Sequence, residues 1–78
     1  MSADEARRRF PSRLRQAMAM RNSNRTRLAR ALGVDRKTVS LWSNGTSMPI
    51  ADQLAAISEE LDVSADWLLG QSDNPHAD

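Results

Sequence analysis

The feature that most constrains this chain is the way its apolar pattern is broken into short helical stretches. Apolar side chains recur at spacings of three and four, as on one face of a helix, and no stretch alternates long enough to form a strand. Asn24, Asp35 and Ser64 stand where helices can begin, because their short side chains accept backbone hydrogen bonds there. Gly33 and Gly70 stand where helices can end. The pattern predicts an all-α fold, a compact bundle of five short helices.

The first helix is expected to begin near Pro11, because the missing N–H of proline would be unpaired in a first turn anyway. Phe10, just before it, could fold back as an apolar staple. The other helices are expected at about residues 25–32, 36–43 and 50–61, with a short last one at Trp67 and Leu68. One face of the fourth would carry the apolar side chains Ile50, Leu54, Ile57 and Leu61.

The length of 78 residues allows one domain and requires a compact core. We expect residues 1–9 to form a basic flexible arm, frayed or helical, residues 10–70 the folded domain and residues 71–78 a polar tail. With no cysteine, neither a disulfide nor a thiolate metal site can support the core. The single histidine, His76, lies in the polar tail and is expected to be solvated.

Targeting and membrane segments are not apparent. No apolar run approaches the roughly 20 residues that cross a membrane, and residues 1–5 lack the apolar segment of a signal peptide. We therefore expect a cytoplasmic protein with no membrane partner.

The charges divide sharply along the chain. Residues 1–45 hold all eleven Lys and Arg residues and three acidic ones, a net charge of +8. Residues 46–78 hold seven acidic residues and no basic one, a net charge of −7. This asymmetry favours contact of the first half with a polyanion, although solvated helix faces would give the same composition.

Residues 25–43 predict one structural unit. Two short helices joined by residues 33–35 must cross at a steep angle, as in a helix-turn-helix. In such a unit Ala29 must be small, because the second helix passes close above it. The side chains expected to face the core are Leu28, Leu32, Val34, Val39 and Trp42.

Residues 25–45, RTRLARALGVDRKTVSLWSNG, resemble the Cro and lambda-repressor-like helix-turn-helix family, also called the Xre family. Residues 61–70, LDVSADWLLG, are similar to the ending of many phage-type members. The resemblance covers about residues 10–70. It implies a lambda-repressor-like DNA-binding domain that binds as a dimer with its third helix in the major groove.

The chain departs from the family pattern at two places. Arg25 stands where the family commonly has glutamine at the start of the second helix. Met18 and Ser43 stand where many members pair an arginine with a glutamate. An apolar replacement of such an ion pair can be neutral for stability.

The expected base-contacting residues lie on the third helix. With Val39 and Trp42 turned inward, helical geometry directs other side chains toward the groove. Arginine and lysine can donate to O6 and N7 of guanine, serine can bond to several bases or to phosphate, and leucine can meet a thymine methyl. The four residues are Arg36, Lys37, Ser40 and Leu41.

Phosphate contacts are expected from three other places. The start of the second helix offers free N–H groups and the charge of Arg25. The backbone at Asn44 and Gly45 offers a second clamp, and the basic arm could track a phosphate or enter the minor groove. The arm could equally be a disordered solubilising segment. The full expected set is Asn24, Arg25, Thr38, Asn44, Gly45, Arg7, Arg8 and Arg9.

These residues predict a sequence-specific transcriptional regulator, a repressor in the leading hypothesis, that binds a pseudo-palindromic operator in double-stranded DNA as a homodimer. Leu69 has no obvious place in the core and could face the partner subunit. Because the chain ends shortly after Gly70, we expect a Cro-like regulator, a restriction-modification controller or an antitoxin.

The alternative is an antitoxin or other protein-interaction module that binds a partner protein through the acidic second half. No phosphate-binding glycine loop and no nucleophile–base pairing is apparent, so we expect no catalytic residue, no metal and no cofactor.

Overall fold

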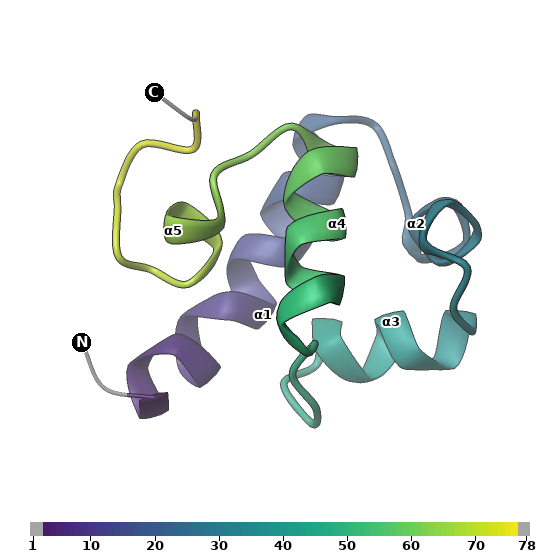
Figure 1. Ribbon diagram of the computed structural model, residues 1–78, viewed down its shortest axis with the longest axis horizontal. Helices are drawn as coiled ribbons and strands as arrows, with labels where there is room; N and C mark the ends of the chain where they lie inside the picture. Colours follow the sequence, from purple (N-terminus) through teal and green to yellow (C-terminus); the bar gives the residue numbers. More distant parts are fainter. Residues whose placement is uncertain (1–2, 77–78) are drawn as a thin grey trace.

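The computed structural model describes residues 3–76, and that part of the chain holds five α-helices and no strand. The helices are α1 (Ala3–Met20), α2 (Arg25–Leu32), α3 (Arg36–Ser43), α4 (Ala51–Leu61) and α5 (Ala65–Leu68). Helices α2 and α3 lie to one side of α1 and α4, and α5 and the C-terminal segment lie to the other (Figure 1). The expected all-α, five-helix fold is confirmed.

Helix α1 begins at Ala3, so the expected start near Pro11 is wrong, and residues 3–9 take the helical one of the two forms expected for the arm. Met1 and Ser2 lie outside the described residues. Asp4 and Glu5 stand in the first turn, where carboxylates favour a helix N-terminus. Pro11 removes one helical hydrogen bond, but its ring is buried. Phe10 is fully buried inside the helix, which corrects its expected position as a staple.

The core is formed by one apolar side of each helix. Leu28, Val39 and Trp42 are almost fully buried, as expected. Leu32, Val34, Leu54 and Leu69 are half-buried and pack against the core. The side chains that form its centre are Phe10, Leu14, Ala17, Met18, Leu28, Ala29, Val39, Trp42, Ile57, Leu61, Val63, Trp67 and Leu68.

Two expectations about apolar residues are wrong. Ile50 is the N-cap of α4 and is 65% exposed, because the helix begins one residue later than expected and its first turn points away from the core. Leu69 is half-buried and packs against the core, so it does have a place there, and its contact with a partner subunit stays a prediction.

The caps account for the ends of the short helices. The Asn24 carboxamide oxygen accepts from the N–H of Arg27 at 2.8 Å, and Ser64 caps α5 in the same way. Gly33 ends α2 with φ +72°, a left-handed conformation that glycine adopts without strain. Asp35 occupies the N-cap of α3 as expected, but its side chain makes no capping hydrogen bond.

Arginines of α1 and of the turn after it donate hydrogen bonds to carbonyls at the ends of three other helices. Arg21 donates to the carbonyls of Leu61 and Asp62 at the end of α4, at 2.8 and 2.9 Å. Arg15 donates to the carbonyl of Ser43 at the end of α3. Arg13 donates to the carbonyl of Trp67 in α5, and Arg9 donates to that of Gly70 in the turn after it. The last carbonyls of a helix lack internal partners and carry partial negative charge, so these cations stabilise the ends on which they act.

The C-terminal segment is folded back onto α1 and α5. Arg13 donates to the carbonyls of Trp67 and Ser72 at 3.1 and 3.2 Å, and its guanidinium lies 4.6 Å from the centre of the Trp67 ring. Arg9 donates to the carbonyl of Gly70 at 3.3 Å. The N–H of Ser64 donates to the carbonyl of Pro75 at 2.7 Å. The expected polar tail is thus held in place over residues 71–76.

Replacing Arg13 by alanine should lower the free energy of unfolding by about 1–3 kcal/mol, because two charged hydrogen bonds and a cation–π contact are lost together. Arg27, which is exposed on α2, is the matched control, and Arg27→Ala should change stability by less than about 0.5 kcal/mol. Urea unfolding followed by tryptophan fluorescence measures both. Equal effects of the two substitutions would contradict a stabilising role for the Arg13 contacts.

Candidate nucleic-acid interface

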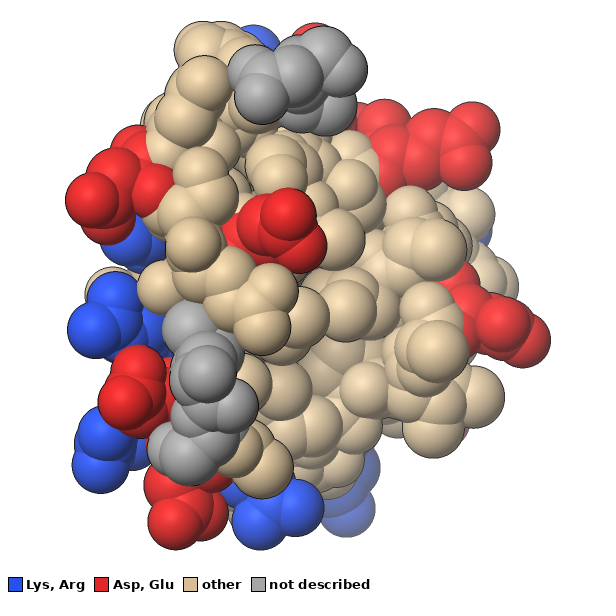
Figure 2. Space-filling model, turned by 60° about the vertical axis from the view of Figure 1, so that its left-hand side comes forward, with Lys and Arg blue, Asp and Glu red and all other residues tan. Residues whose placement is uncertain are grey.

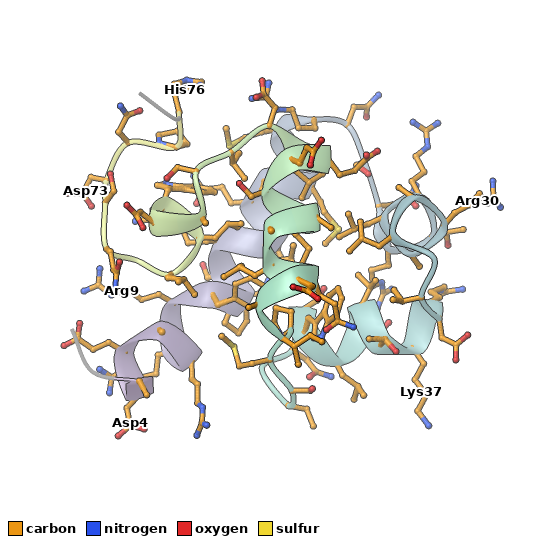
Figure 3. The ribbon with its side chains drawn as sticks, viewed as in Figure 1. Asp4, Arg9, Arg30, Lys37, Asp73 and His76 are labelled. Carbon is orange, nitrogen blue, oxygen red and sulfur yellow. The ribbon has the colours of Figure 1, made fainter. Side chains whose placement is uncertain are left out.

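The outer face of α3 is set by the two large residues that the helix buries. Val39 and Trp42 are in the core, so Arg36 and Lys37 are exposed at the N-terminus of the helix. Lys37 points away from the body of the molecule (Figure 3). Neither cation makes a hydrogen bond or ion pair to residues 3–76. Both are therefore available to a ligand.

Farther along α3 the surface is less exposed. Ser40 and Leu41 are half-buried, and so is Thr38. The Ser40 hydroxyl accepts a hydrogen bond from the Arg25 guanidinium at 3.4 Å. Arg25, which was expected to contact phosphate, thus bridges the start of α2 and the outer face of α3. This contact could not be predicted from the sequence, since the two residues lie on different helices.

The start of α2 is the second expected binding element. The oxygen of the Asn24 side chain is used in capping, so its NH₂ group remains as a donor. Arg25 and Asn24 line an open hollow of about 310 Å³, whose largely apolar lining includes Met18 and Ala19. The part of this lining formed by Asn24 and Arg25 is called the rim below. Cations and free backbone N–H groups meet at this rim, as an anion requires.

Met18 and Ser43, which replace the ion pair of many family members, both line this hollow. The Ser43 hydroxyl donates to the Val39 carbonyl at 2.9 Å, and the Ser43 carbonyl accepts from Arg15. The hydroxyl and the carbonyl of Ser43 therefore both have hydrogen-bond partners. Arg15, which lies about one turn before Met18 on α1, places a cation at the end of α3.

The loop after α3 differs from the expected backbone clamp. The N–H groups of Asn44 and Gly45 donate to the carbonyls of Ser40 and Trp42, and the N–H of Thr46 donates within the same turn. These donors are used internally, so a phosphate there must be held by side chains.

The three arginines expected to act together lie on separate sides of α1, because each helical residue is rotated by about 100° from the last. Arg9 donates to the carbonyl of Gly70 beside α5, and Figure 3 places it near the C-terminal segment. Arg7 lies over the loop after α3 and lines a groove with residues 45–48. Arg8 is exposed and makes no hydrogen bond or ion pair among residues 3–76.

The charge division read from the sequence becomes less sharp in the fold. Arg9, Arg13, Arg15 and Arg21 are engaged with backbone carbonyls, which leaves seven of the eleven basic side chains for a ligand. On the face in Figure 2, acidic side chains are spread over a largely uncharged surface, with basic side chains at its left and lower edges.

Within residues 3–76 no helix is long and apolar enough to cross a membrane. In the same range no three His, Asp or Glu side chains gather as metal ligands.

Comparisons with known proteins agree with the resemblance read from the sequence. The bacteriophage CI repressor helix-turn-helix domain matches residues 12–76. The HTH-type transcriptional regulator PrtR of Pseudomonas aeruginosa is 41% identical over 59 residues, which cover 76% of this chain and 23% of PrtR. The chain spans about a quarter of the length of that relative, so the expectation of a short, one-domain regulator stays a prediction. From residue 12 to residue 76, the chain belongs to the bacteriophage CI repressor helix-turn-helix domain family.

Proposed function

We propose that the protein is a sequence-specific repressor that reads the major groove of double-stranded DNA with α3. This proposal rests on the exposure of Arg36 and Lys37. Both are exposed at the N-terminus of a helix whose opposite side is fixed by Val39 and Trp42. In helix-turn-helix proteins, it is this end of the second helix that contacts base edges.

The chemistry of these side chains favours guanine. Arg36 can donate two parallel hydrogen bonds to O6 and N7 of one guanine, and Lys37 can donate to the same acceptors of a neighbour. Ser40 and Leu41 lie farther along the helix and are half-buried. They are suited to a hydrogen bond with a base or phosphate and to contact with a thymine methyl.

A phosphate would be held at the start of α2. The first N–H groups of a helix have no internal partners, and Arg25 and the Asn24 NH₂ group lie at the same rim. The hydrogen bond from Arg25 to Ser40 ties this rim to α3. A duplex whose phosphate is held at the rim therefore also lies next to the face of α3 proposed to contact bases. Thr38, half-buried on α3, is proposed as a further phosphate contact.

The proposed binding unit is a two-fold dimer on a pseudo-palindromic operator, because a single α3 of 8 residues contacts too few bases to select one site. Leu69 is half-buried against its own core and offers only part of its surface to a partner subunit. Ile50 is the large apolar side chain with the greatest exposure in the described part of the chain. Repression then follows if the dimer occludes a promoter.

Replacing Arg36 by alanine should cost about 1–3 kcal/mol at the cognate site and relax the preference for guanine at one position. Arg27→Ala is the control: if this exposed side chain contacts only the DNA backbone, its loss weakens binding to all sequences alike. Competition binding against a library of site variants measures both effects. Full discrimination by the Arg36→Ala protein would refute the assignment of α3 as the specificity element.

Footprinting should protect two half-sites whose centres lie about 10–10.5 bp apart, or a multiple of that spacing. Ile50→Glu should weaken the dimer in sedimentation experiments and lower operator affinity. Met20, exposed at the end of α1, is the control, and Met20→Glu should leave both unchanged. Protection of one half-site by a strictly monomeric protein would contradict the two-fold arrangement.

A further inference from the structure

We propose that the groove between the N-terminal half of α1 and the loop after α3 binds a DNA phosphate, with Arg7 as its only cation. This groove clamp, formed by Arg7 and residues 45–48, rests on the proposed function and identifies a second anchor for the duplex. It differs from the rim at the start of α2, which is formed by other helices.

The two sides of the groove are held together by a close contact between Pro11 and Gly45. A Cβ atom added at Gly45 would lie 3.3 Å from Cγ of Pro11, so no side chain separates helix and loop there. Gly45 also has φ +83°, which lets the chain turn directly beneath α1. Arg7 precedes Pro11 by one helical turn and therefore shares its face of α1. This register places Arg7 above residues 45–48, where it lines a groove of about 510 Å³.

The groove presents donors and no carboxylate. Arg7 is exposed and has no hydrogen-bond or ion-pair partner among residues 3–76. The hydroxyl groups of Thr46 and Ser47 likewise make no hydrogen bond in that range, whereas the loop N–H groups are used internally. Residues 36–51 contain no acidic side chain. Asp4 lies one turn before Arg7 on α1, but no ion pair joins them in the structure. A guanidinium beside two hydroxyls suits a phosphate oxygen.

The position of the groove indicates that the phosphate belongs to DNA. The start of α1, the loop after α3 and α3 itself lie along one edge of the molecule (Figure 1), the edge at which Lys37 projects (Figure 3). The loop continues the chain directly from α3, so a strand that passes α3 reaches this groove next. Of the three consecutive residues Arg7, Arg8 and Arg9, only Arg7 therefore contacts the phosphate in this groove, because Arg9 faces α5.

The test measures DNA affinity as a function of salt for the full chain and for Arg7→Gln and Arg8→Gln. Each phosphate contact contributes about 0.9 to the slope of log affinity against log salt. Arg7→Gln should lower the slope by about that amount and weaken cognate and unrelated DNA equally. Arg8 was expected to contact phosphate together with Arg7, but it lies on another side of α1, and this proposal gives it no phosphate contact. Arg8→Gln is therefore the matched control and should leave the slope unchanged. Glu59→Gln should also leave it unchanged, because an exposed charge more than about 8–10 Å from the duplex is screened.

The outcomes separate this proposal from the proposed function. If the unaltered chain does not bind DNA at any salt concentration, the proposed function fails. If it binds with discrimination that depends on Arg36, but Arg7→Gln keeps the full slope, the groove clamp alone is overturned. Equal losses from Arg7→Gln and Arg8→Gln would also overturn it, because they would reflect overall charge. Thermal unfolding of each variant, expected to match that of the unaltered chain, verifies that the fold is intact.

Discussion

The arrangement of this domain depends on hydrogen bonds between arginine side chains and the carbonyl ends of helices. Helix α1 and the turn after it contribute Arg15 to the end of α3, Arg21 to the end of α4, and Arg9 and Arg13 to the end of α5. Short helices have little stability of their own, and each leaves carbonyls without partners. A cation carried by a long helix gives those carbonyls a further partner, in addition to the caps that end each short helix. The outer face of α3 is set by the burial of Val39 and Trp42, and Arg15 adds a contact at the end of that helix.

Much of the fold could be predicted because its signals are local. The caps at Asn24 and Ser64 and the turn at Gly33 each act within a few residues, so the sequence shows them directly. The start of α1 could not be placed because Pro11 suggested a first turn, while the burial that offsets its lost hydrogen bond comes from distant packing. The acidic pair Asp4 and Glu5 was the signal that could have located the true start. Ile50 was misplaced because helical spacing alone does not show where the first turn ends.

The candidate site, like the fold, could be predicted from the sequence only in part. The exposure of Arg36 and Lys37 follows from helical geometry once Val39 and Trp42 are inward, so the sequence was sufficient for it. The contact of Arg25 with Ser40 joins two helices and depends on their crossing. The separate directions of Arg7 and Arg9 became clear only when residues 3–9 proved helical. Net charge was the least direct guide, because it counts arginines that are engaged with the backbone together with those that face solvent.

The nature of the acceptors in these arginine contacts has a consequence for divergence within the family. Arg15, Arg21 and Arg13 donate to main-chain oxygens, which are present whatever side chain occupies the position. Substitutions at the ends of α3, α4 and α5 can therefore accumulate without removing the acceptors that position these helices. The exposed side chains of α3 can therefore differ between related proteins while the helices keep their positions. Exposed residues of α3 can thus be replaced without compensating changes in the core.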